Sequence, residues 1–317
     1  MRIGLQVSAD RGRYATKVEK LRADAGWADA AGLDSIWTPQ IPDEFDAMTA
    51  ATVIGTATSR IEIGTAIVPI QPRHPIALAQ QALSTQAVCG GRFVLGLGVS
   101  HHWIIRDMLG LPYERQALTM RSYLDVLDQA LAGPGLVEVE NELFEIRNPL
   151  DVTDLIPTPV MIAALGPVML KLAGERAAGT SLWLADERTI ESHVVPTISR
   201  AAAAAGRPAP RILAGVPVCL CRDDEIDVAV ARTNRVLAEA EMSPNYQKLL
   251  DLGDARLVGD ILAAGSERTI EKRFRSFADA GVTDISLRVV PIGEGREERL
   301  ASSQRTRDYL ASLAGSV

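Results

Sequence analysis

Two adjacent histidines come shortly after an apolar run that contains two glycines, in a chain of 317 residues with four histidines. The run 93–99 reads Phe-Val-Leu-Gly-Leu-Gly-Val, and Ser100, His101 and His102 come next. Imidazole titrates near neutral pH, so a histidine at a strand end can exchange a proton with a bound molecule. We predict that His101 contacts a ligand or donates a proton. Neighbours on a strand point to opposite sides, so His102 faces away from the ligand or hydrogen-bonds a loop backbone.

A glycine and a proline mark a second place where a ligand could bind. Gly166 and Pro167 join the apolar segment 160–165 to the helical segment 167–177. Proline is favoured at the first helical position, and the glycine leaves the free backbone N–H groups open to a ligand. The first turn carries no acidic side chain. This pattern predicts a phosphate site, with an ordinary turn that binds nothing as the alternative.

The remaining strand ends offer little intrinsic reactivity. Gln40, just after a strand that ends at Thr38, is a neutral hydrogen-bonding group and the third catalytic candidate beside His101 and His102. The lysines fall in helical patterns, which disfavours a Schiff-base enzyme. Acidic residues are not spaced with the histidines as metal ligands would be, so we expect no metal. An organic cofactor is expected to carry the chemistry.

The scaffold that positions these residues alternates short apolar runs with helical patterns. Strands are predicted near 3–7, 35–38, 61–68, 93–99, 160–165, 181–185, 212–221 and 284–290. Helices are predicted near 15–30, 46–58, 75–88, 116–132, 167–177, 187–205, 266–279 and 297–313. Nearly all-apolar strands suit a parallel sheet covered by helices. Eight such units predict an α/β fold, a single (β/α)8 TIM barrel over residues 1–317, with its site at the C-terminal strand ends.

Two segments do not fit the bare barrel. Residues 136–146, after the fourth helix, alternate around Asn141 and predict an inserted hairpin. Residues 223–264, after the seventh strand, predict a mostly helical insertion. Insertions that follow barrel strands lie above the mouth, where they shape the pocket.

Composition restricts the partners and the compartment. The formal net charge is −7, with acids and bases interspersed, which favours neither nucleic acid nor an anionic membrane. No signal peptide and no apolar run of membrane-spanning length is evident. We interpret Cys89, Cys219 and Cys221 as buried reduced thiols. The expected protein is cytoplasmic.

The other histidines and the tryptophans allow further predictions. His74 precedes Pro75 and is predicted to cap a helix, whereas His193 is predicted on a helix surface. Trp37, Trp103 and Trp183 lie at or just beyond strand ends and could wall a hydrophobic pocket. Core packing is the preferred interpretation of Trp37 and Trp183.

Several motifs in order resemble a known superfamily. The segments 64–69, 73–82 and 90–98 are similar to the luciferase-like monooxygenase superfamily. Ser100-His101, together with the segment 163–174, resembles its coenzyme F420-dependent actinobacterial branch. The likeness covers essentially the full chain.

The resemblance implies a TIM barrel that binds coenzyme F420, or alternatively FMN, at its mouth. It implies a cis peptide at Ala66–Ile67, behind the cofactor ring, and a cofactor phosphate against the loops after strands four and five. The residues that it implies for cofactor binding are Thr38, Ala66, Ile67, Val68, Gly98, Ser100, His101, Ala164, Leu165, Gly166 and Pro167.

The chain departs from the sugar-phosphate-oxidising relatives. Those carry an acid at the position of His101 and Asp-His after strand two, where this chain has Thr38-Pro39-Gln40. The resemblance therefore implies an F420-dependent oxidoreductase that transfers hydride to or from another organic small molecule. An FMN-dependent monooxygenase is the first alternative, and a non-catalytic cofactor-binding subunit is the second. Relatives also imply a homodimer.

Overall fold

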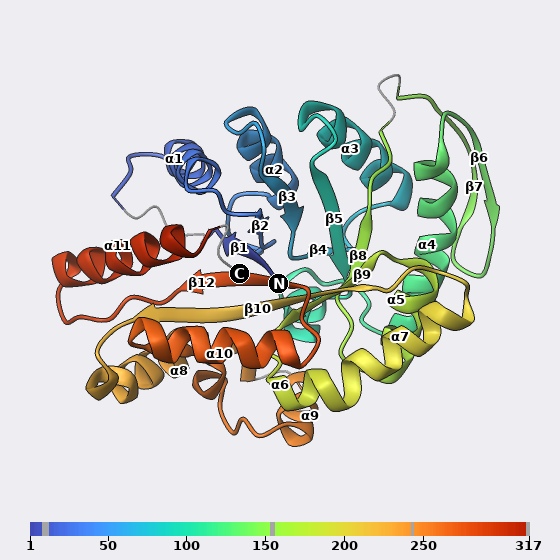
Figure 1. Cartoon of the computed structure of the whole chain (residues 1–317). Coiled ribbons are helices and arrows are strands. Elements are labelled where there is room, and N and C mark those ends of the chain that lie inside the picture. The colour runs from blue at the N-terminus through green and yellow to red at the C-terminus, as the bar shows by residue number, and fades with distance from the viewer. Residues whose placement is uncertain (8–12, 153–155, 242–243, 315–317) are drawn as a thin grey trace.

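The computed structural model describes residues 1–7, 13–152, 156–241 and 244–314. Within them, eight parallel strands close into a barrel, because β9 pairs with β10 as well as with β8. In sheet order these strands are β1 (Arg2–Gln6), β2 (Ser35–Thr38), β3 (Glu62–Thr65), β5 (Phe93–Gly98), β8 (Val160–Ile162), β9 (Gly179–Trp183), β10 (Arg211–Leu220) and β12 (Asp284–Val289). Helices surround the strands (Figure 1). The predicted TIM barrel is confirmed.

The third strand is interrupted by a bulge. The Ala66–Ile67 peptide is cis, as the resemblance implied, and the chain continues as β4 (Val68–Pro69) along β5. A Cβ at Gly96 would lie 1.9 Å from the Thr65 carbonyl oxygen. Glycine is therefore required where the bulge passes over β5.

The predicted helices form close to their expected bounds. They are α1 (Lys17–Ala30), α2 (Ala47–Thr56), α3 (Pro75–Val88), α4 (Gln116–Ala132), α5 (Pro167–Arg176), α10 (Glu267–Asp279) and α11 (Arg296–Leu313). His74 caps α3 by accepting the Ile76 N–H at 3.3 Å, which confirms its predicted role.

One predicted helix, 187–205, is not regular. It divides into α6 (Glu187–Thr189), the π-helix η2 (Ile190–Val194) and α7 (Val195–Ala204). Pro196 lacks an N–H group and its ring displaces the carbonyl one turn earlier, so α-helical hydrogen bonding cannot continue through this point. A second π-helix, η1 (Trp103–Met108), follows β5 and was not predicted.

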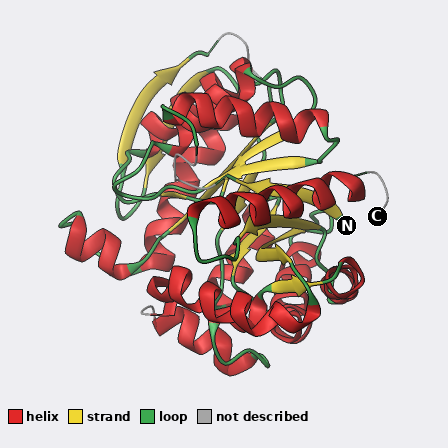
Figure 2. Ribbon diagram, turned by 90° about the vertical axis from the view of Figure 1, so that its left-hand side faces the viewer, coloured by secondary structure: helices red, strands yellow, loops and turns green. Residues whose placement is uncertain are grey.

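Both insertions are present. The hairpin pairs β6 (Gly135–Glu140) with β7 (Glu145–Leu150), extends past the predicted end at 146, and lies outside the barrel (Figure 2). The second insertion is mostly helical, but it ends in a strand that pairs with β10. Its elements are η3 (Asp223–Glu225), α8 (Ile226–Glu241), α9 (Pro244–Leu252), η4 (Val258–Ile261) and β11 (Ala263–Gly265).

Two tryptophans occupy the barrel, each opposite a glycine. Trp37 is fully buried, and a Cβ at Gly64 would lie 2.1 Å from its ring. A Cβ at Gly215 would lie 2.5 Å from the ring of Trp183, which is half-buried. The core role of Trp37 is thus confirmed, whereas Trp183 keeps some exposure near the strand ends.

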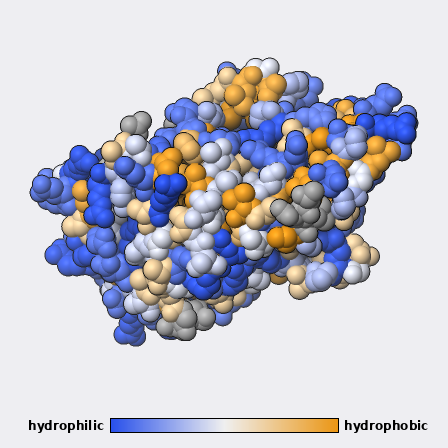
Figure 3. Space-filling model, turned by 90° about the horizontal axis from the view of Figure 1, so that it is seen from above, coloured by the Kyte–Doolittle hydropathy of each residue, from blue (hydrophilic) through white to orange (hydrophobic). Residues whose placement is uncertain are grey.

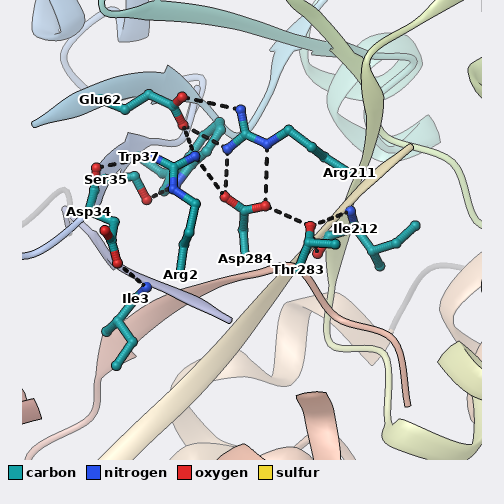
Figure 4. Close-up of polar contacts among 10 residues, drawn as sticks. All are labelled: Arg2, Ile3, Asp34, Ser35, Trp37, Glu62, Arg211, Ile212, Thr283 and Asp284. Carbon is teal, nitrogen blue, oxygen red and sulfur yellow. Dashed lines mark hydrogen bonds and ion pairs between the residues drawn. The ribbon is translucent and has the colours of Figure 1, made fainter. Parts of the chain in front are cut away.

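Four charged residues close the opposite, N-terminal end of the barrel (Figure 4). Arg2, Glu62, Arg211 and Asp284 are the first residues of β1, β3, β10 and β12. The Arg211 guanidinium donates to Asp284 at 2.6 Å and to Glu62 at 2.7 Å, and Arg2 donates to both carboxylates at 3.1 Å. These carboxylates raise the pKa of Arg211 in spite of its burial, so each charge is compensated.

The face of the molecule that Figure 3 shows, seen from above Figure 1, is mainly hydrophilic, with separate groups of apolar side chains among polar ones. In the described part of the chain, no helix has both the length and the apolar character needed to cross a membrane. The three cysteines are buried and free, as predicted.

Candidate functional site

The turn after β5 holds the two adjacent histidines. Ser100 adopts a left-handed conformation with φ 56°, which is uncommon for a residue other than glycine. The Tyr113 hydroxyl donates to the Ser100 carbonyl at 2.8 Å and fixes the turn. The histidines therefore follow a turn, and the strand alternation expected to separate them does not apply.

His101 lies between two aromatic rings. Its ring stacks on Trp103, with centroids 5.7 Å apart and an interplanar angle of 18°. Its ring also lies beside that of Tyr246, from helix α9 of the second insertion, with the two ring centroids 5.5 Å apart. Burial, and then the charge of His102, lower the pKa of His101. A neutral imidazole accepts a proton more readily than it donates one, so this geometry favours a proton acceptor over the predicted donor.

His102 has a different environment. It immediately precedes η1, is half-buried, and its ring centroid lies 6.3 Å from that of Tyr113. Tyr113 thus contacts both ends of the Ser100–His102 turn. The aromatic residues Tyr113 and Tyr246 were not predicted, because only the fold brings them to the strand ends.

The turn between β8 and α5 is open. Gly166 is the N-cap of α5, Pro167 is the first helical residue, and no side chain caps the helix. The N–H groups of Val168 and Met169 have no acceptor among the described residues. Nothing lies within 4 Å of the position that a Cβ on Gly166 would take. These features match an anion site.

Three other helices that follow barrel strands are closed by the side chain of their N-cap residue, whereas the N-cap side chains of α4, α10 and α11 make no such hydrogen bond. Thr16 caps α1, Asp46 caps α2 and Asp186 caps α6, each by accepting a backbone N–H. These side chains occupy the positive helix ends that an anion would otherwise reach. The α5 N-terminus lacks such a group.

Residues from three neighbouring strands come together beside this turn. A Cβ at Gly98 would lie 3.0 Å from both Ile67 and Ala163, so the bulge packs over β5 and against the end of β8. Ala164 and Val68 are buried, whereas Leu165 is half-buried and Gly166 is exposed. The structure therefore assembles most of the residues predicted to bind a cofactor.

The Thr38 carbonyl accepts the Ala66 N–H at 2.8 Å, but the side chains of Thr38 and Gln40 make contacts toward α2. The Thr38 hydroxyl donates to the Ala47 carbonyl at 3.2 Å, toward α2. The Gln40 side-chain oxygen accepts the Ala47 N–H at 3.0 Å and an N–H of Arg73 at 3.4 Å. These side-chain contacts secure the start of α2, and the cofactor-binding role of Thr38 and the catalytic role of Gln40 stay predictions.

The prediction for His193 was wrong. His193 is half-buried in η2, and its Nε2 lies 2.9 Å from the Leu165 carbonyl oxygen in the β8–α5 turn. No sequence pattern signals this contact, because it depends on how η2 packs beside the end of β8.

Six buried side-chain polar atoms lack a hydrogen-bond partner among the described residues, and two of them are the Nε atoms of Arg232 and Arg273. The other four are Gln6 Oε1, Gln71 Oε1, Trp103 Nε1 and Ser286 Oγ. Gln6 and Ser286 stand on the adjacent strands β1 and β12, and Gln71 donates through Nε2 to Val99, next to the histidine turn. A buried polar atom without a partner costs about 1–3 kcal/mol. A ligand with its own donors and acceptors would satisfy these atoms.

Three large apolar side chains are exposed on the segments that follow β8 and β5, and the charged Arg106 and Asp107 of η1 are exposed near two of them. Val168 is 58% exposed, and Met108 and Leu109, at the end of η1, are 54% and 42% exposed. These side chains follow β8 and β5, which are neighbours in the barrel. In the described ranges, no group of three or more His, Cys, Asp or Glu side chains is placed to hold a metal ion.

Comparison with known proteins gives the family. The model of the luciferase-like monooxygenase family matches residues 1–284. The chain belongs to this family. The match includes the β3 bulge, the histidine turn and the open start of α5.

Relatives in this family use either a deazaflavin or a flavin. A Mycobacterium tuberculosis protein named as a coenzyme F420-dependent oxidoreductase is 27% identical over 202 residues, covering 58% of this chain and 56% of that protein. The 5,10-methylenetetrahydromethanopterin reductase of Methanopyrus kandleri is 24% identical over 318 residues, covering 86% of this chain and 89% of the reductase.

Solved structures share the fold across the whole chain. The F420-dependent tetrahydromethanopterin reductase of Methanopyrus kandleri superposes with a TM-score of 0.75 at 22% identity, covering 100% of this chain and 98% of that one. A Pseudomonas putida type II Baeyer-Villiger monooxygenase, solved with FMN, superposes with a TM-score of 0.74 at 17% identity, covering 100% of this chain and 97% of that one.

Proposed function

We propose that this protein is an F420-dependent oxidoreductase that transfers hydride between the deazaflavin and an organic small molecule. The observation that carries the proposal is the open N-terminus of α5, with free N–H groups and an unfilled space at Gly166. Family membership and the F420-dependent relatives support the choice of cofactor.

The residues present fit such a cofactor. Its phosphate is an anion, and the Val168 and Met169 N–H groups would hold it. The pyrimidine edge of a deazaflavin or flavin carries both N–H and C=O groups. The unpartnered atoms of Gln6, Gln71 and Ser286 supply matching acceptors and a donor.

F420, when bound, supplies a ring carbon that accepts or gives hydride. The protein supplies proton transfer and a dry site. When a substrate carbon that bears a hydroxyl is oxidised, neutral His101 takes the hydroxyl proton. Trp103 and Tyr246 flank the half-buried His101 and restrict the access of water to it.

The site favours an uncharged, largely apolar substrate. The aromatic rings around His101 and the exposed Val168, Met108 and Leu109 form an apolar surface. Ligand pockets combine such surface with a few polar groups that orient the ligand. The substrate class is therefore an organic alcohol or carbonyl compound of low charge.

An FMN-dependent monooxygenase is the second candidate, since an FMN-bound monooxygenase has the same fold. Turnover assays separate the candidates. Substrate-dependent oxidation of reduced F420, or reduction of its oxidised form, without oxygen supports the proposal. Oxygen consumption with reduced FMN, without F420 turnover, would replace it. No turnover with either cofactor would support a non-catalytic subunit. The homodimer stays a proposal, testable by light scattering.

A further inference from the structure

We propose that His193 is a positioning residue that holds the β8–α5 turn in the conformation that receives the cofactor phosphate. This inference rests on the proposed function. His193 itself touches the backbone of the turn, through the Leu165 carbonyl oxygen, at 2.9 Å.

The contact fixes which nitrogen of His193 carries a proton. A carbonyl oxygen accepts hydrogen bonds and cannot donate them, so Nε2 must be the protonated nitrogen. The bond is half-buried, where water competes for the carbonyl less than it does at the surface.

Fixing the Leu165 carbonyl also orients the next N–H group. The Leu165 carbonyl and the Gly166 N–H belong to one planar trans peptide, in which they point in opposite directions. With the carbonyl directed at η2, the Gly166 N–H points away from η2. It has no acceptor among the described residues and adds a third donor to those of Val168 and Met169. His193 thereby sets the direction of the turn's first donor.

His193 is itself held by a well-anchored segment. The Asp186 carboxylate accepts the N–H groups of Thr189 at 2.8 Å and of Ala255 at 2.9 Å. The Thr189 hydroxyl donates to the Leu249 carbonyl of α9 at 3.3 Å. Helix α9 also carries Tyr246 against His101. The segment 186–194 therefore connects the open turn with the insertion that covers His101.

The test uses variants that separate the hydrogen bond from the volume of the side chain. His193→Leu removes the donor, whereas His193→Gln keeps an N–H donor on a long side chain. Ser192→Ala is the matched control, because the Ser192 hydroxyl donates to the Arg188 carbonyl within its own helix, at 2.7 Å, and not to the turn.

Binding is measured for F420 and for the same deazaflavin riboside without the phosphate, with thermal melting as a check on folding. His193→Leu should weaken F420 binding about ten-fold or more and change binding of the phosphate-free form by less than about two-fold. His193→Gln should recover F420 affinity to within about three-fold, and Ser192→Ala should match the wild type.

The outcomes are distinct. If wild type binds F420 and His193→Leu binds it equally well, the inference is wrong and the proposed function stands. Equal weakening of both ligands would also overturn it, since the effect would not involve the phosphate. If the wild type binds no F420, the proposed function fails and the inference fails with it.

Discussion

Replacing Gly166 with valine should weaken cofactor binding and leave the fold intact. Gly166 has φ −90° and ψ 159°, an extended conformation that valine adopts readily. Nothing lies within 4 Å of the position that its Cβ would take. The branched side chain would therefore enter the space through which the phosphate reaches the α5 N-terminus.

The magnitude follows from the hydrogen bonds at stake. The N–H groups of Gly166, Val168 and Met169 have no acceptor among the described residues, and a bond to a charged group is worth about 1.5–3 kcal/mol. Losing one such bond weakens binding about ten-fold to 150-fold. The substitution also restricts the unfolded chain, so the free energy of unfolding should be unchanged or rise by about 0.4–1 kcal/mol.

The assay is a titration of purified protein with F420, followed by calorimetry or by cofactor fluorescence, beside urea unfolding. Gly295→Val is the matched control. Gly295 caps α11 with φ −91° and ψ 168°, and nothing lies within 4 Å of its Cβ position either. The Glu298 carboxylate, which accepts the Glu294 N–H at 2.7 Å, closes that helix end. Gly295→Val should bind F420 as the wild type does.

Normal F420 binding by folded Gly166→Val would refute the placement of the phosphate at α5. Equal loss in both glycine variants would show that valine at a helix N-terminus acts generally, and the reasoning from the open turn would fail.

Four further predictions concern the histidines, the pH profile, the charged cluster and Asp186. His101→Ala should lower kcat for substrate oxidation about 10²–10⁴-fold, with a smaller effect on F420 affinity. His102→Ala should lower kcat less than about ten-fold. The opposite order in steady-state kinetics would show that His102, and not His101, transfers the proton. Burial, and then the charge of His102, lower the pKa of His101 below its ordinary 6.5, so wild-type kcat/KM for substrate oxidation should rise with pH with its midpoint below that value. A midpoint above 6.5 would count against His101 as the proton acceptor. In Arg211→Met, Arg2 is left as the shared partner of Glu62 and Asp284, so the free energy of unfolding in urea should fall by about 3–5 kcal/mol while F420 affinity stays unchanged. An unchanged stability would contradict the role of these four charged residues in closing the barrel. Burial alone would raise the pKa of Asp186, but three backbone N–H donors lower it overall, so the stabilisation by its carboxylate is present above about pH 4 and is lost as pH falls through the lowered pKa. Asp186→Ala should therefore lower the free energy of unfolding in urea by about 1–2 kcal/mol at about pH 7. A difference in stability between wild type and variant that did not shrink toward about pH 3 would contradict this prediction.

The barrel could be predicted because its strands and helices carry strong local patterns. The apolar runs of β5 and β10, for example, are bounded by glycine and polar steps that appear in the sequence. Pro167 marked the start of α5 and His74 the start of α3. The two π-helices were not predictable in this way, because their widened turns depend on Pro196 in one case and on packing after β5 in the other.

The site was predicted less completely than the fold. The direction of the Thr38 side chain could have been predicted from strand alternation. Because Trp37 lies inside the barrel, the side chain of the next residue, Thr38, points outward to α2. Strand alternation does not apply to His102, because the chain turns at Ser100 before reaching it, and the role of His102 stays a prediction. His193 and Tyr246 reach the site through η2 and α9, and neither position carries a local signal in the sequence.

The most direct test of this account is equilibrium binding of F420 and of FMN to the purified apoprotein, measured side by side in the same buffer. The account predicts that F420 binds at least about ten-fold more tightly than FMN, and that Gly166→Val weakens F420 binding by about ten-fold or more. FMN binding as tight as F420 binding or tighter, with oxygen consumption by the reduced FMN complex, would contradict it.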